Sequence, residues 1–175
     1  NPSFLSTPGA KDVGIEFYTF SKTFNMAGWR LAFAAGNEQM IEALNLIQDH
    51  LFVGIFPALQ EAGIAALLDP KSEEAVAQLN ATYDSRRDAF VQAAAKIGWK
   101  AFPSKGSFYA WMPVPEGYTS ESFADLLLEK AHVAVAPGKG FGPAGDAYVR
   151  IGLLVEPERL VEAVNRIANL HLFNN

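Results

Sequence analysis

Near the start of the chain, a lysine lies among hydroxyl residues at the end of an apolar run that is typical of a buried strand. The lysine is Lys22, the hydroxyl residues are Thr19 and Ser21, and Arg30 closes the same segment. A lysine amine can form a Schiff base with an aldehyde, and hydroxyls with an arginine can hold a dianionic phosphate. The spacing therefore favours a cofactor that carries both groups. The alternatives are a solvated surface lysine and hydroxyls that only cap a turn.

A second candidate, Arg150, lies in a predicted strand near the C-terminus. Side chains alternate between the two faces of a strand, so we expect Val149 and Ile151 on one face. Tyr148 and Arg150 then lie on the other face. From the residues alone, an exposed strand arginine is the better interpretation.

Composition excludes several classes of function. The chain has 175 residues, half of them apolar, with 19 acidic residues, 14 basic residues and no basic run, which argues against nucleic-acid binding. No apolar stretch reaches the length of a membrane span. Cysteine is absent and the three histidines are far apart, so the sequence offers no disulfide or evident metal site. These features fit a cytoplasmic protein without a membrane partner.

The pattern along the chain predicts an α/β protein. Strands are expected where short apolar runs occur, at residues 15–20, 30–35, 99–102, 107–112, 133–136 and 148–154. Helices are expected after Asn37 as a cap, from Pro57, over residues 72–97 ending at Gly98, from Ser120 as a cap to Ala131, and from Pro157. Residues 137–145 are expected to form a glycine-rich loop.

The segment from Thr19 to Arg30 resembles the cofactor-lysine motif of class I and II aminotransferases, Ser-x-Ser-Lys-x-(Phe/Tyr)-x-x-x-Gly-x-Arg. Thr19 replaces the first serine of the motif and keeps its hydroxyl. The resemblance implies that pyridoxal 5′-phosphate is the cofactor and that Lys22 is the catalytic residue that binds it covalently. It also implies that Thr19, Ser21 and Arg30 bind the cofactor phosphate.

Three further segments resemble the same family. The late strand with Tyr148-Val149-Arg150-Ile151 implies that Arg150 clamps the substrate α-carboxylate. Gly106-Ser107-Phe108-Tyr109 resembles a strand that borders the substrate, so Phe108 is a substrate-binding candidate, with a core aromatic as the equal alternative. Pro137-Gly138 and Phe141-Gly142 match a family loop.

The resemblance implies the C-terminal portion of the fold type I pyridoxal-phosphate transferase fold. Residues 1–56 would be a remnant of the large domain, residues 57–71 a connecting helix near the dimer partner, and residues 72–175 the small C-terminal domain. Because the chain begins with Asn1 and a lysine-bearing strand follows almost at once, we expect a piece of a longer enzyme that is inactive alone.

The implied function is amino transfer between an amino acid and a 2-oxo acid by a homodimer. The sequence around Lys22 and the sequence from Trp111 to Gly117 most resemble those of bacillary N-acetyl-LL-diaminopimelate aminotransferases, which belong to lysine biosynthesis. Two alternatives stay open. One is an aminotransferase-like effector domain of a transcription regulator, and the other is a β-lyase on the same fold.

Overall fold

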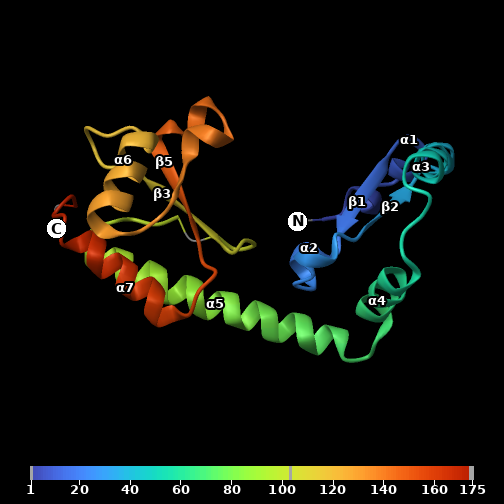
Figure 1. Ribbon diagram of the computed structural model, residues 1–175, viewed down its shortest axis with the longest axis horizontal. Helices are drawn as coiled ribbons and strands as arrows, with labels where there is room; N and C mark the ends of the chain where they lie inside the picture. The colour runs from blue at the N-terminus through green and yellow to red at the C-terminus, as the bar shows by residue number, and fades with distance from the viewer. Residues whose placement is uncertain (1, 103, 174–175) are drawn as a thin grey trace. The chain divides into compact units, whose positions relative to one another are not determined.

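The computed structural model describes residues 2–102 and 104–173 and confirms an α/β architecture (Figure 1). The chain divides into two units, residues 1–79 and 80–175, and the division falls within one long helix. Each unit is described by itself below.

The N-terminal unit is built on a two-stranded antiparallel sheet whose strands flank the lysine segment. Strand β1 (Ile15–Thr19) pairs with β2 (Ala32–Gly36), so that Thr19 lies opposite Ala32. Between the strands are α2 (Phe20–Thr23) and the 3-10 turn η2 (Ala27–Trp29). The remaining elements are η1 (Phe4–Ser6), α1 (Ala10–Val13), α3 (Glu38–Leu51) and α4 (Pro57–Leu68).

Local signals placed two helices of this unit, α3 and α4, correctly. The Asn37 side chain accepts a hydrogen bond from the backbone N–H of Met40 and so caps α3, and Pro57 opens α4. Two expectations were wrong. The first strand ends at Thr19 instead of residue 20, because the Thr19 side chain caps the short helix α2, which carries Lys22. Strand β2 begins at Ala32 instead of residue 30, because Arg30 has a left-handed backbone with φ of 53°.

The C-terminal unit has two layers. Its sheet contains β3 (Tyr109–Pro113), β5 (Tyr148–Gly152) and β4 (Ala136–Pro137) in that order, all antiparallel. Helices α5 (Ser72–Lys96), α6 (Ser120–Leu126) and α7 (Pro157–Ala168) supply the other layer, and α6 continues into the π-helical turn η3 (Leu127–Ala131). Two 3-10 turns, η4 (Gly138–Phe141) and η5 (Pro143–Ala147), precede β5.

Alternation along the strands separates a core face from an open face. Met112 and Val149 are fully buried and belong to one core cluster with Phe90 of α5, Phe123 of α6 and Val164 of α7. The opposite face of the sheet holds the side chains with odd numbers on β3 and even numbers on β5, which are only partly buried or exposed. Arg150 therefore lies on the face away from the core, as its place in the sequence predicts.

Three expectations in this unit were wrong. Of the strand expected at residues 133–136, only Ala136 lies in a strand, β4. The other two were wrong because tertiary contacts override local patterns. Residues 99–102 form no strand. Phe102 makes one isolated bridge to Trp111, and Trp99 is buried, with its indole N–H donating to the Pro113 carbonyl at 2.8 Å. The cap of α6 is Thr119 rather than Ser120, which is buried and bonds elsewhere.

Candidate active site

Lys22 lies on α2, and the hydroxyls before it form one hydrogen-bonded group. The Thr19 hydroxyl oxygen accepts from the Ser21 backbone N–H at 3.2 Å and lies 3.0 Å from the Ser21 hydroxyl. Thr19 and Lys22 are exposed, and Ser21 is half-buried. An amine and two hydroxyls are thus presented within one turn of chain.

Arg30 lies beside the end of β1, where Thr19 is located. The Phe20 backbone N–H donates to the Leu31 carbonyl at 3.2 Å, so the residue after Arg30 pairs with the residue after Thr19. The Arg30 guanidinium donates to the Ala27 carbonyl at 3.2 Å, which orients an otherwise exposed side chain. A left-handed backbone at a residue other than glycine is uncommon and concentrates at functional positions.

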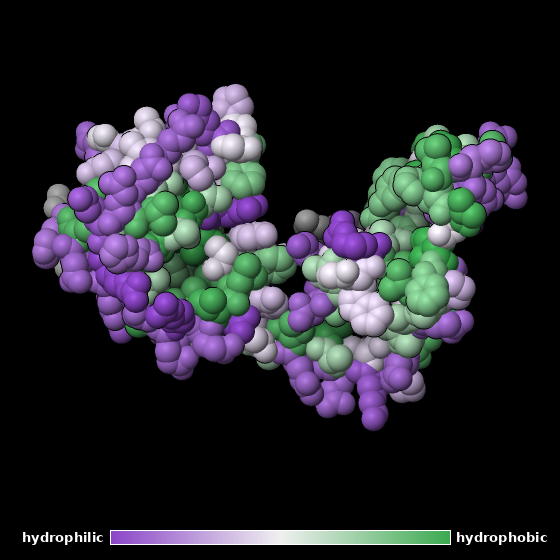
Figure 2. Space-filling view, viewed as in Figure 1, coloured by the Kyte–Doolittle hydropathy of each residue, from purple (hydrophilic) through white to green (hydrophobic). Residues whose placement is uncertain are grey.

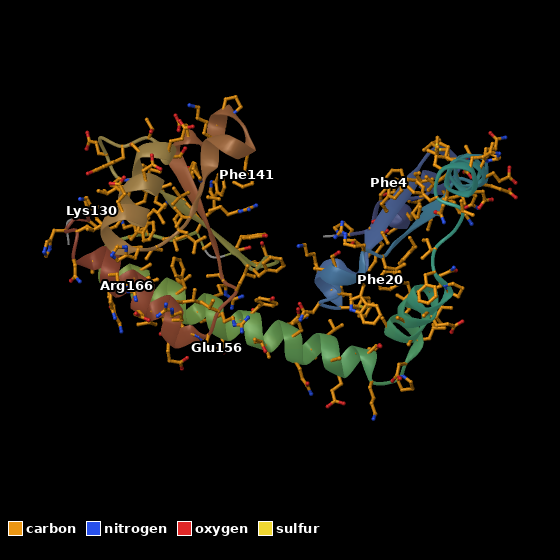
Figure 3. All side chains as sticks on the ribbon, in the orientation of Figure 1. Phe4, Phe20, Lys130, Phe141, Glu156 and Arg166 are labelled. Atoms are coloured by element: carbon orange, nitrogen blue, oxygen red, sulfur yellow. The ribbon has the colours of Figure 1, made fainter. Side chains whose placement is uncertain are left out.

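A cluster of aromatic side chains packs against the segment that carries Lys22. Phe20, labelled in Figure 3, is the first residue of α2 and is 3 % exposed. Its ring contacts those of Phe24 and Phe33, with centroids 5.6 and 5.8 Å apart. The Tyr18 hydroxyl lies 2.7 Å from the Thr23 hydroxyl and joins β1 to the end of α2. Helix α4 approaches the cluster through Gly63, where an added methyl would lie 2.7 Å from Leu31 and 3.3 Å from Phe20. The backbone that carries Lys22 is therefore held on two sides.

Arg150 meets two aromatic rings in the C-terminal unit. Its Cζ atom lies 4.2 Å from the centroid of the Tyr109 ring and 4.1 Å from that of Phe141. The side chain is half-buried, and within the described part of the chain it makes no hydrogen bond or ion pair. Its N–H donors are therefore available to an anion.

Phe108 packs on Tyr109, one of the two rings that meet the guanidinium. Its ring contacts Tyr83 at 5.3 Å and Tyr109 at 4.6 Å. Tyr109 and Phe141 were missed as site residues in the sequence. Strand alternation could have identified Tyr109, because its partner Gly152 is two residues from Arg150 on the same face. No local signal identifies Phe141, which comes from the glycine-rich turn η4.

Turn η5, which follows the turn that carries Phe141, is anchored to α6. The buried Ser120 hydroxyl donates to Asp146 at 2.8 Å, and the Ser120 backbone N–H donates to the same oxygen at 3.2 Å. These bonds lower the pKa of the Asp146 carboxyl, because they favour its charged form. The ammonium of Lys139 binds Glu121 at 2.9 Å, and this hydrogen bond raises the pKa of Lys139.

Comparison with known proteins identifies the family. The model for aminotransferases of class I and II matches residues 5–167. The chain belongs to this family.

Relatives and solved structures agree with that assignment. L-glutamine–4-(methylsulfanyl)-2-oxobutanoate aminotransferase of Bacillus subtilis is 61 % identical over 98 % of this chain and 42 % of its own length. LL-diaminopimelate aminotransferase of Moorella thermoacetica is 49 % identical over 95 % of this chain and 42 % of its length. The apo structure of BacF from Bacillus subtilis superposes with a TM-score of 0.93 at 48 % identity, over 99 % of this chain and 44 % of that one.

The chain thus spans less than half the length of these aminotransferases, which confirms that it corresponds to a portion of the fold type I architecture. The family resemblance seen in the motif is confirmed. Aminotransferases of this family use pyridoxal phosphate.

The residues present fit that cofactor. Two adjoining hydroxyls and a guanidinium match the oxygens of a phosphate dianion, and Lys22 supplies an amine on the same segment. Within the described ranges, no helix is long and apolar enough to cross a membrane, and no cluster of three histidine, aspartate or glutamate residues could hold a metal.

Proposed function

We propose that the full-length protein is a pyridoxal-phosphate-dependent aminotransferase that moves an amino group between an α-amino acid and a 2-oxo acid. The observation that carries the proposal is the grouping of Lys22 with the hydrogen-bonded hydroxyls of Thr19 and Ser21 on a segment closed by Arg30. Residues 1–56 would belong to the large domain, residues 57–71 to a connecting segment and residues 72–175 to the small domain.

Each residue has a role that follows from its chemistry. The bound cofactor supplies an aldehyde for an amine and a ring that withdraws electrons from the substrate α-carbon. Thr19, Ser21 and Arg30 would hold the cofactor phosphate, and the Lys22 amine would hold its aldehyde. The same Lys22 Nζ atom would serve as the base that takes the proton from the substrate α-carbon.

Arg150 binds the substrate α-carboxylate. A planar guanidinium offers two parallel N–H groups to a carboxylate, and no described residue occupies those of Arg150. Phe108, which packs on Tyr109, would border the substrate from farther away.

Two substrate pairs are supported by different observations. The sequence around Lys22 and from Trp111 to Gly117 favours N-acetyl-LL-diaminopimelate with 2-oxoglutarate as the substrate pair. The relative at 61 % identity is instead a glutamine–4-(methylsulfanyl)-2-oxobutanoate aminotransferase, which favours glutamine with a thioether 2-oxo acid. Initial rates of the full-length protein with both pairs, at equal cofactor saturation, would separate them by kcat/KM.

The full-length protein is further proposed to be a cytoplasmic homodimer. The N-terminal unit exposes large apolar side chains around the break between α3 and α4, visible as green surface in Figure 2. They are Leu51, Phe52, Val53 and Phe56. Apolar surface of this kind marks contacts with further polypeptide. Sedimentation of the full-length protein as a fully active monomer would contradict the dimer.

The direct test is to trap the cofactor on the protein. Borohydride reduction of the full-length holoenzyme, followed by peptide mass mapping, is expected to place the pyridoxyl group on Lys22. Lys22→Ala is expected to lower kcat by at least about 100-fold, since proton transfer by a positioned base contributes that much. The matched control is Lys71→Ala, another exposed lysine of the same unit, which should leave kcat unchanged.

A label on a different lysine would refute the assignment. Release of ammonia and a 2-oxo acid without an amino acceptor would instead favour the β-lyase alternative. Cofactor binding with neither reaction would favour a sensing domain.

A further inference from the structure

The guanidinium of Arg150 contacts two aromatic rings, those of Tyr109 and Phe141, and has no acidic partner among the described residues. A half-buried guanidinium without a counter-ion is unfavourable unless something else compensates its charge. The faces of aromatic rings attract a cation within about 6 Å but leave its in-plane N–H donors unbonded. Both ring centroids lie well inside that limit, at 4.2 Å for Tyr109 and 4.1 Å for Phe141.

We propose that Tyr109 and Phe141, here called the aromatic pair, are positioning residues for Arg150. They hold the guanidinium in place while leaving its donors for the substrate carboxylate. This inference rests on the proposed function, because it assumes that Arg150 binds that carboxylate.

Each ring of the aromatic pair has its own support. Tyr109 packs against Phe108 with centroids 4.6 Å apart, and Phe141 meets Trp111 edge-on at 5.8 Å and 73°. Trp111 in turn stacks on Tyr148 at 5.5 Å and 25°. The rings that touch Arg150 are thus themselves packed against further aromatic rings, as positioning groups require.

Phe141 also depends on a tightly closed turn. It is the last residue of η4, and Figure 3 shows it projecting from this part of the chain. The segment from η4 to η5 closes where Gly138, the first residue of η4, touches Gly145 of η5 backbone to backbone. A methyl on Gly138 would lie 2.2 Å from the Gly145 carbonyl oxygen. Together with the bonds from Ser120 to Asp146, this contact fixes the place from which Phe141 reaches Arg150.

The consequence for catalysis is a lower entropic cost of substrate binding. A free arginine side chain has many rotamers, and a ligand that selects one of them loses affinity. A guanidinium already held by two rings avoids that loss. Since the carboxylate is bound alike before and during proton transfer, loss of a ring should raise KM more than it lowers kcat.

The test uses the full-length holoenzyme and whichever acceptor the wild type turns over, 2-oxoglutarate or 4-(methylsulfanyl)-2-oxobutanoate. Phe141→Leu and Tyr109→Leu are each expected to raise KM for the acceptor about 3- to 20-fold, with kcat within about twofold of wild type. Phe141→Tyr and Tyr109→Phe keep the rings and should keep KM. Phe141 is 52 % exposed, so its truncation leaves the core intact.

A second measurement distinguishes positioning from direct contact with substrate. In an Arg150→Ala background, the leucine substitutions should raise KM no further, because there is no guanidinium left to position. An unchanged KM in the leucine variants, or an equal rise in the Arg150→Ala background, would overturn the inference while leaving the proposed function intact. A wild-type protein that transfers no amino group would refute the proposed function itself.

Discussion

Replacing Gly63 of α4 with alanine is expected to displace the segment that carries Lys22. Gly63 is the buried residue of α4, and the new methyl would lie 2.7 Å from Leu31 Cδ2 and 3.3 Å from Phe20 Cζ. Phe20 begins the helix that carries Lys22, and Leu31 follows Arg30. One added methyl therefore presses on both ends of the proposed cofactor site.

The expected magnitude follows from two opposing effects. Carbon atoms pack at about 3.5–4.0 Å, so Leu31 must move by roughly 1 Å. Leu31 and Phe20 are only 6 % and 3 % exposed, so neither can swing into solvent, and such overpacking costs about 1–3 kcal/mol. Alanine is better than glycine in a helix by about 1 kcal/mol. We expect a net loss of about 1 kcal/mol in the free energy of unfolding.

The effect on rate should exceed the effect on stability. A displacement of about 1 Å at a catalytic group can lower a rate by on the order of 100-fold. Part of the shift of Phe20 will reach Lys22, two residues along the same short helix. Gly63→Ala is therefore expected to lower kcat by about 10- to 100-fold in a protein that still folds.

The assay combines thermal unfolding and steady-state kinetics of the full-length protein. Gly106→Ala is the matched control, because a methyl there meets nothing within 4 Å. Adding Leu31→Ala to Gly63→Ala removes the clashing atoms, so the double variant should be more stable than the sum of the single changes predicts. Wild-type kcat in Gly63→Ala, or strict additivity in the double variant, would refute the reasoning.

The remaining predictions concern the C-terminal unit. Arg150→Ala should weaken binding of the 2-oxo acid by about 2–5 kcal/mol, measured as a rise in KM with cofactor loading unchanged. Arg150→Lys should recover only part of this loss, because lysine lacks the planar pair of donors. Asp146 has a pKa below its ordinary value of 3.8, so its stabilising effect is complete above that pH and is lost as the pH falls through the lowered folded pKa. Acid unfolding of Asp146→Asn should lack this part of the wild-type pH dependence, and an identical pH profile would show that the Ser120 contact contributes nothing.

Those parts of the fold that depend on local chemistry could be predicted from the sequence. Asn37, Pro57 and Pro157 begin helices through a side-chain cap or a fixed φ, and neither effect needs distant partners. Gly98 ends α5 with φ of 81°, which glycine adopts easily.

Features that depend on distant contacts could not be predicted. Trp99 lies in an apolar run that predicts a strand, yet its indole bonds to Pro113 and its ring packs on Phe123. Ser120 is as good a helix cap as Thr119 by residue type. It is buried because its hydroxyl donates a hydrogen bond to Asp146, far along the chain. Residue type alone cannot decide between two adjacent caps when one of them has such a partner.

The surroundings of Arg150 show where prediction from the strand pattern ends. Alternation correctly places Arg150 on the open face, and the antiparallel register puts Trp111 directly opposite it. The register alone would therefore predict Trp111 as the aromatic partner of Arg150. In the structure Trp111 stacks on Tyr148 instead, and the guanidinium meets the diagonal neighbour Tyr109 and Phe141 from a separate turn. Diagonal neighbours on a sheet are within reach of long side chains, so competition between rings decides the pairing. The family motif could indicate Arg150, but only the folded chain shows which rings hold it.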